Sequence, residues 1–221
     1  ADPEPDPDER LALAYGASSL RPAFSALLAL DQMLSRSVLH VSQPLLGRIR
    51  IAWWREQCEL LSGEAPMRDP LLIGLRALDR SGVLPASRLA QLFDAWDALA
   101  FGDDESDGGI AAHGHAAGST LYMLAAELAG IEPTDAVAGA GAVRTLMKIG
   151  RSARDDGPAR MARAAAASLP RRSSELPPRL RPFAILARFA ERDALAPAGR
   201  LPAQGSPRRL LQIWGLIAGI R

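Results

Sequence analysis

Asp31 is the first residue of this sequence that could take part in chemistry, because it interrupts an apolar helical stripe. The predicted helix Pro22–Val41 has an aliphatic face, and Asp31 lies about 40° from the centre of that face. The aliphatic side chains are those of Leu27, Leu34, Val38 and Val41. A buried, unpaired carboxylate costs several kcal/mol, so Asp31 must be paired, protonated or placed at the edge of a cavity. A salt bridge to a nearby arginine is the simplest expectation, and a functional carboxylate in a cavity is the alternative.

Asp94 and Asp97 are the second candidate, since they stand three residues apart on the predicted helix Ala86–Phe101. This spacing could bring their carboxylates close together, and paired carboxylates serve as acid and base or bind a metal. An aspartate pair at the border of an apolar helix face is more often only solvated. Both interpretations stay open at this point.

Two other groups of potential ligands lack the pattern of a metal site. The acidic loop at 102–109 resembles an EF-hand calcium loop in part, but Glu105 stands at the third place and Gly114 at the twelfth, where a bidentate glutamate is needed. His113 and His115 would point about 200° apart on a helix, with no third ligand nearby. They would share a metal only in an extended turn. We therefore expect a solvated loop and no metal.

Composition excludes several classes of protein. Cys58 is the only cysteine, so an intrachain disulfide and a cysteine-based zinc site are ruled out, and we expect a cytoplasmic location. A formal net charge of +1 and a pI near 8.2 give no basic footprint for nucleic acid. The opening residues are acidic and proline-rich, unlike a secretory or transit signal, and no apolar stretch reaches the ~20 residues of a membrane span.

The hydrophobic pattern predicts an all-α protein with one domain over residues 1–221. Every periodic stretch has the helical period, and 48% hydrophobic residues are enough for one sizeable core. Prolines at 3, 5 and 7 predict an extended lead-in over residues 1–9, with a first helix beginning near Pro7–Asp8. Further helices are expected at 44–62, 71–80, 86–101, 116–129 and 135–150, in an alanine-rich stretch that ends at about 169, and at 183–192, followed by a final segment at 207–221.

The helix after Pro44 has an apolar face that we expect to pack against the core. Leu46, Ile49, Trp53 and Leu60 share this face, while charged residues such as Arg48 and Glu59 lie on the other side. With Trp53 on the apolar face, core packing is expected for it rather than stacking on a base or sugar.

The string PLLGRIRIAWWRE at 44–56 resembles the start of the second major helix in the squalene/phytoene synthase family. This resemblance implies a single isoprenoid-synthase-like bundle around a central apolar cavity. Active members of the family join two prenyl diphosphates head to head, with magnesium held by two aspartate-rich motifs of the form DxxxD. The helices Pro22–Val41 and Gly139–Gly150 would then face each other and frame the cavity.

The same resemblance places Ser35 and Leu39 at the first pair of aspartates, and Lys148 and Ser152 at the second pair. Hydroxyl, isobutyl and ammonium groups cannot replace carboxylates as ligands for a hard divalent cation. The resemblance therefore implies a non-catalytic homologue without metal or cofactor, similar to the family's complex I assembly factors. Such a protein would bind an isoprenoid or lipid tail, or act as an assembly or interaction protein with a protein partner.

Two alternatives remain. The chain could be a magnesium-dependent prenyl diphosphate transferase that uses the displaced acids Asp31, Asp94 and Asp97, or an interaction module with a filled core. A large apolar cavity would favour lipid binding, whereas carboxylates converging at its mouth would favour the enzyme. The final segment PRRLLQIWGLIAGIR would dock on the bundle or rest on a membrane surface, the latter placing the protein at the periphery of the inner membrane.

Overall fold

The structure, a computed structural model, describes residues 6–40, 43–64, 66–101, 107–152, 156–197 and 201–218. Ten α-helices and no strand occur among these residues, which confirms the all-α prediction. The helices are α1 (Pro7–Ala14), α2 (Arg21–Leu39), α3 (Pro44–Glu59), α4 (Pro70–Arg80), α5 (Ala86–Phe101), α6 (Asp107–Leu128), α7 (Asp135–Ser152), α8 (Asp156–Ser168), α9 (Arg181–Ala194) and α10 (Pro207–Ile217). Short 3₁₀ turns follow at Leu60–Ser62, Ser173–Glu175 and Pro178–Leu180.

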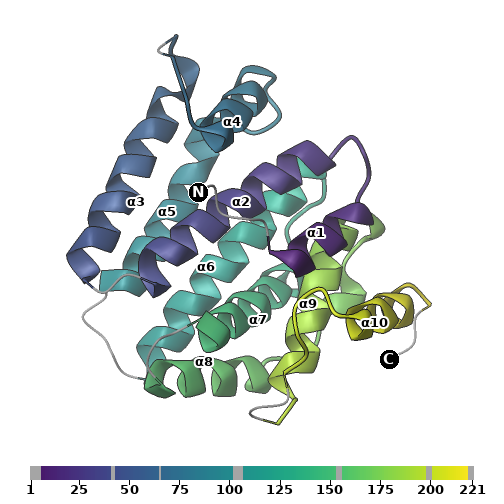
Figure 1. The fold of residues 1–221 in the computed structure, drawn as a ribbon. Helices are drawn as coiled ribbons and strands as arrows, with labels where there is room; N and C mark the ends of the chain where they lie inside the picture. Colours follow the sequence, from purple (N-terminus) through teal and green to yellow (C-terminus); the bar gives the residue numbers. More distant parts are fainter. Residues whose placement is uncertain are drawn as a thin grey trace.

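The helices are arranged around a central pair, α6 and α7 (Figure 1). α5, α3 and α4 lie on one side of this pair, α9 and α10 lie on the other, and α8 packs against α7. α2 packs on α3, α4, α5 and α6, and α1 connects α2 to α9. One cluster of buried apolar side chains runs through the sequence from Ala12 to Ile213, and a second one joins α7, α8 and α9. These contacts hold the facing surfaces of α2 and α7 in fixed positions.

The central helices approach each other closely at two glycines, Gly118 of α6 and Gly141 of α7. A Cβ atom added to either glycine would lie 2.1 Å from the backbone carbonyl oxygen of the other. No side chain fits into such a contact, so the two backbones can touch only where both residues are glycine.

Two predicted boundaries were wrong. The extended lead-in does not reach residue 9, because Pro7 opens α1 and the Asp6 side chain caps it by accepting a hydrogen bond from the Asp8 N–H at 2.8 Å. Residues 1–5 lie outside the described part of the chain. α6 begins at Asp107 and not at 116. Its first turns contain little apolar periodicity, but Gly114 packs against Leu146 and Ile149 of α7, and this tertiary contact outweighs the weak local signal.

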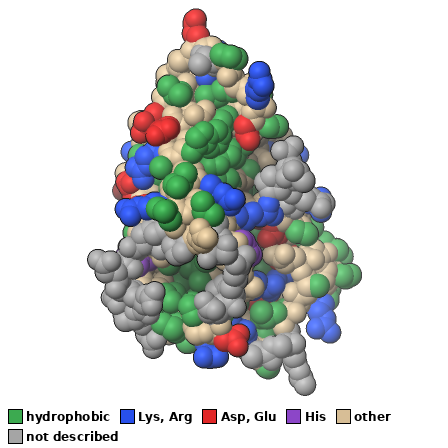
Figure 2. Space-filling model, turned by 60° about the vertical axis from the view of Figure 1, so that its left-hand side comes forward, with side chains coloured by type: hydrophobic (Ala, Val, Ile, Leu, Met, Phe, Trp, Pro, Cys, Tyr) green, Lys and Arg blue, Asp and Glu red, His purple; other side chains and the backbone are tan. Residues whose placement is uncertain are grey.

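The predicted core face of α3 is also wrong. Leu46, Ile49, Trp53 and Leu60 have 45%, 56%, 46% and 51% of their surface exposed. α3 instead buries the opposite stripe, in which Gly47, Ile51 and Cys58 recur at helical spacing. Figure 2, in which this side of the molecule comes forward, shows hydrophobic side chains lying open to solvent.

The final helix, α10, docks on the bundle as expected. Arg209 and Ile213 are almost fully buried, and α10 packs on α9. Its other side is open, since Leu211 and Trp214 are 68% and 65% exposed. Among the described residues, no helix is both long and apolar enough to cross a membrane.

Candidate functional site

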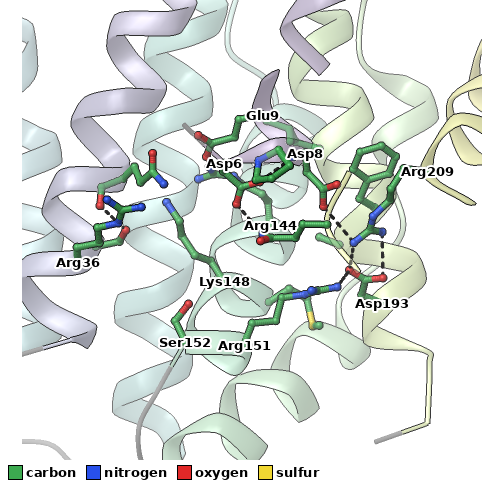
Figure 3. Close-up of a pocket in the computed structure, with 18 of the residues that line it drawn as sticks. Asp6, Asp8, Glu9, Arg36, Arg144, Lys148, Arg151, Ser152, Asp193 and Arg209 are labelled. Carbon is green, nitrogen blue, oxygen red and sulfur yellow. Dashed lines mark hydrogen bonds and ion pairs between the residues drawn. The ribbon is translucent and has the colours of Figure 1, made fainter. Parts of the chain in front are cut away.

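A polar pocket of about 370 Å³ lies where α1, α2, α7 and α9 meet (Figure 3). α2 and α7 supply its two main walls, and residues of α1 and α9 close its other side. The charged and polar lining residues include Asp6, Asp8, Glu9, Gln32, Ser35, Arg36, His40, Arg144, Lys148, Arg151, Ser152, Asp193 and Arg209. The pocket is therefore lined largely by ionisable groups.

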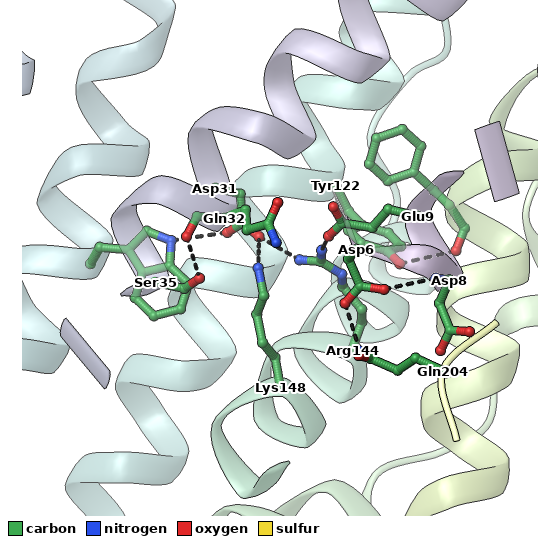
Figure 4. Close-up of polar contacts among 12 residues, drawn as sticks. Asp6, Asp8, Glu9, Asp31, Gln32, Ser35, Tyr122, Arg144, Lys148 and Gln204 are labelled. Carbon is green, nitrogen blue, oxygen red and sulfur yellow. Dashed lines mark hydrogen bonds and ion pairs between the residues drawn. The ribbon is translucent and has the colours of Figure 1, made fainter. Parts of the chain in front are cut away.

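Asp31 forms the buried floor of this region, behind the lining residues (Figure 4). Its Oδ1 accepts a hydrogen bond from the indole Nε1 of Trp96 at 3.0 Å. Its Oδ2 accepts from Nη1 of Arg144 at 2.6 Å and from Nζ of Lys148 at 2.8 Å. The expected salt bridge between Asp31 and an arginine is confirmed, and Lys148 adds a second cation.

The surroundings of Asp31 decide its charge. Complete burial alone would raise the pKa of this carboxyl, but Lys148 and Arg144 more than offset burial and lower the pKa to about 2. Asp31 is consequently ionised at neutral pH, and both of its oxygens already have partners.

Arg144 connects Asp31 to α1. Its Nη2 lies 2.5 Å from Oε1 of Glu9, and both side chains are almost fully buried. Burial raises the pKa of the Glu9 carboxyl. The nearby Lys148 and Arg144 act to lower this pKa, whereas the negative charge of Asp31 raises it further. For Arg144, Asp31 and Glu9 together overcome burial and raise the pKa of the guanidinium.

A second group of ion pairs closes the pocket on the α9 side. Asp193 accepts from Arg151 at 2.5 Å and from both terminal nitrogens of Arg209, at 3.0 and 2.8 Å. Arg209 also lies 3.1 Å from Asp8 of α1 and stacks over the ring of Phe189. Burial raises the pKa of Asp8, although the Gly205 N–H and Arg209 act in the opposite direction.

The charges of the whole region balance. Five acidic groups line or underlie the pocket, namely Asp6, Asp8, Glu9, Asp31 and Asp193, and five basic groups do so, namely Arg36, Arg144, Lys148, Arg151 and Arg209. With histidine neutral, the formal charges sum to zero. In Figure 3, Arg36, Lys148 and Ser152 lie at one side, and Asp8, Asp193 and Arg209 lie at the other.

The four positions that the resemblance assigns to lost aspartates are only partly brought together. Ser35, Lys148 and Ser152 line the polar pocket. The Ser35 hydroxyl donates to the Gln32 carbonyl oxygen at 2.9 Å, within its own helix. Leu39 is not among the lining residues and packs instead against the hydrophobic core.

The alternative acids do not converge. Asp94 pairs with Arg55 at 2.6 Å and its side chain is 66% exposed, while Asp97 lies 3.9 Å from Arg48. Both contacts join α5 to α3 at the surface. Trp96 of the same helix points to Asp31, and Asp94 and Asp97 lie about 160° and 100° around the helix from Trp96.

Metal ligands do not gather elsewhere in the described residues. Within them, no group of three or more His, Cys, Asp and Glu side chains is arranged to hold a metal ion. His115 contacts the Ser119 hydroxyl at 3.2 Å and is exposed. Residues 102–106 of the acidic loop lie outside the described part.

An apolar groove of about 480 Å³ adjoins the polar pocket. Its lining residues come mainly from α1, α2, α3 and α4 and include Leu13, Ala26, Leu28, Ala29, Met33, Trp54 and Leu71. Glu9 and Gln32 line both the groove and the pocket. On α2, Ser25, Ala29, Gln32 and Arg36 recur at spacings of three and four, so one stripe of this helix runs from the groove into the pocket.

Several of these residues had not been recognised in the sequence, chiefly Glu9, Arg144, Asp193 and Arg209. Arg144 could have been found, because Arg144, Lys148 and Arg151 form a basic i, i+4, i+7 stripe on a helix predicted to frame the cavity. Glu9, Asp193 and Arg209 lie in ordinary amphipathic segments, where the local sequence does not mark them as pocket residues.

Comparison of the chain with protein-family models, with curated proteins and with solved structures finds no match.

Proposed function

We propose that this protein is a non-catalytic relative of the squalene/phytoene synthases that binds an isoprenoid or other lipid tail. The observation that carries the proposal is the state of Asp31, the one acid at the base of the pocket that is fully buried. Trp96, Arg144 and Lys148 occupy both of its oxygens. A magnesium ion needs free carboxylate oxygens and would have to displace two cations to reach Asp31.

The lining of the pocket supports the loss of catalysis. In the synthases, magnesium neutralises the diphosphate as its charge develops during ionisation. Here Ser35, Lys148 and Ser152 occupy pocket positions that the resemblance assigns to metal-binding aspartates. Lysine offers a positive charge of its own and hydroxyls bind magnesium poorly, so the pocket would hold an anionic head group directly through basic side chains.

The groove supports binding of an apolar tail. It is lined by aliphatic side chains and Trp54, and it meets the polar pocket at Gln32. An amphipathic molecule with one chain could place its tail along α2 in the groove and its head group near Lys148 and Arg36. Burial of the tail would supply most of the binding free energy, at roughly 25 cal/mol per Å² of apolar surface.

Isothermal titration calorimetry with farnesyl diphosphate, with magnesium or with EDTA, tests this proposal. We expect the same binding in both conditions, and at least a tenfold loss of affinity in Ala29→Trp, which fills the groove. Ala164→Trp on the exposed side of α8 is the matched control and should bind normally.

Two results would contradict the proposal. Absence of any binding would exclude the lipid tail and leave assembly or interaction as the role. Condensation of two prenyl diphosphates that stops on addition of EDTA would establish the transferase instead.

A further inference from the structure

The exposed stripe of α3 has no covering element in the described part of the chain. It consists of Leu45, Leu46, Ile49, Trp53 and, in the following turn, Leu60, which are 45–67% exposed. Figure 2, in which the α3 side of the molecule comes forward, shows hydrophobic side chains interspersed with basic and acidic ones. Exposed apolar clusters of this kind mark sites of association.

The charges within and beside the stripe are sorted along the helix. Arg48 and Arg50 stand in the N-terminal half, and Glu56 and Glu59 stand in the C-terminal half. All four residues are exposed. Arg55, the remaining basic residue of the C-terminal half, is engaged by Asp94 of α5.

This order of charges opposes the stability of α3 itself. The helix macrodipole favours acids near the N-terminus and bases near the C-terminus, and α3 has no acid in its first turn and no base in its last. Arg50 and Glu56 have no ion-pair partner among the described residues. Arg48, by contrast, lies 3.9 Å from Asp97 of α5. Ion pairs among the described residues thus do not account for the charges of Arg50 and Glu56.

We propose that α3 pairs with α3 of a second copy of this chain, antiparallel and about a two-fold axis near Trp53. Antiparallel pairing places the basic half of each helix opposite the acidic half of the other, and it also opposes the two macrodipoles favourably. With the axis at Trp53, Leu46 lies opposite Leu60 of the second copy and Arg50 lies opposite Glu56. This single arrangement buries the apolar stripe of each helix and brings residues of opposite charge together.

A membrane surface fits the stripe less well. Interfacial helices that bind anionic lipids carry bases on both sides of the apolar face, whereas Glu56 lies within this stripe and Glu59 at its edge. A 16-residue helix is only about 24 Å long, so the interface is small and we expect dimers at micromolar concentrations.

Charge exchange tests the proposal by sedimentation velocity of the full chain between about 1 and 100 µM. The wild type should shift from the 23.5 kDa monomer to a dimer as concentration rises. An acidic variant, Arg48→Glu with Arg50→Glu, and a basic variant, Glu56→Arg with Glu59→Arg, should each dimerise at least about tenfold more weakly, because like charges then face each other. An equimolar mixture of the two variants should form heterodimers, since every facing pair is again opposite in sign.

This rescue by mixing separates an interface effect from misfolding, because a misfolded variant cannot be rescued by another. Ile49→Glu should remain a monomer. Leu211→Glu on the equally exposed face of α10 is the matched control and should dimerise like the wild type.

A wild type that stays monomeric throughout would overturn the proposal, and so would a mixture that does not associate. Binding of the monomer to phosphatidylglycerol vesicles, abolished by Ile49→Glu, would assign the stripe to a lipid surface instead.

Discussion

Asp31 keeps its charge at a fully buried position because two cations and an indole N–H surround its carboxylate. A buried ion pair adds little stability when it is compared with a well-packed apolar pair, but the removal of one partner is expensive. Arg144 and Lys148 would then remain in the interior with fewer counter-charges. The residue that the sequence marks as a possible ligand is therefore a structural centre.

Asp31→Asn should lower the free energy of unfolding by about 3–5 kcal/mol, because Arg144 and Lys148 lose their shared carboxylate. Urea denaturation followed by circular dichroism measures this change. Asp94→Asn removes an exposed ion pair of similar length and should cost less than about 1 kcal/mol. Equal effects of the two substitutions would contradict the structural role of Asp31.

The stabilisation by Asp31 should disappear in acid. Its pKa of about 2 in the folded chain lies below the ordinary value of 3.8, so the unfolded chain binds this proton more tightly. The contribution is complete above about pH 4 and is lost as pH falls towards 2. The difference in unfolding free energy between wild type and Asp31→Asn, measured by urea titration at several pH values, should shrink over this window. Burial raises the pKa values of Glu9 and Asp8, so their ionisation acts in the opposite direction, and stability is lost as pH rises through their pKa values.

The sequence revealed only some residues of the buried ion-pair network around Asp31. Asp31 was recognisable because an acid within an apolar stripe needs a partner, and the resemblance directed Lys148 into an interior shared with Ser35 of the facing helix. Glu9 lies in an eight-residue helix next to other acids, where nothing distinguishes a buried carboxylate from a solvated one. Its burial depends on contacts with residues more than 100 positions away, which no local pattern contains.

Among the elements, α3 shows where helical periodicity fails. The helix has apolar residues on two sides, Ile51 and Cys58 on one and Leu46, Ile49 and Trp53 on the other. Periodicity reveals both stripes but cannot tell which one is covered, and the larger stripe was taken for the core. Helices with a single stripe were predicted well, as for α5, whose bounds Ala86–Phe101 were correct.

Ile51→Ala should cost about 2–4 kcal/mol, because Ile51 is 1% exposed and its removal leaves a cavity. Trp53→Ala should cost about 1 kcal/mol or less, although tryptophan is much larger, because Trp53 is half exposed and its ring meets that of Trp54 edge to face. Denaturation at submicromolar concentration compares the two monomers. The reverse order would restore the original assignment of Trp53 to the core.

The contact between α6 and α7 depends on the absence of side chains. Gly141→Ala should destabilise the fold by about 1–3 kcal/mol or more, since the new methyl group would overlap the Gly118 backbone. Gly74→Ala in α4 is the control, because a Cβ there meets nothing within 4 Å and alanine is the better helix former. We expect a gain of about 0.5–1 kcal/mol for Gly74→Ala in thermal or urea unfolding. A neutral Gly141→Ala would show that the two helices can separate at little cost.

For the whole molecule, Arg209 connects elements from both ends of the described chain. It is 1% exposed and joins Asp8 of α1 to Asp193 of α9. Arg209→Met keeps the volume but removes the charge, so α10 should lose its attachment while the α6–α7 pair stays folded. Hydrogen exchange should accelerate at least tenfold in α10 and remain unchanged in α7. Arg208→Met, at the exposed neighbouring position, should leave exchange in both helices as in the wild type.

The buried network also imposes an order of events on synthesis. Asp31 is 113 positions from Arg144 and 117 from Lys148. At about 5–20 residues per second, a ribosome needs roughly 6–23 s to reach Arg144 after it has made Asp31. During this interval α2 lacks the two cations that offset the burial of Asp31, so we expect α2 to stay solvated until α7 has emerged.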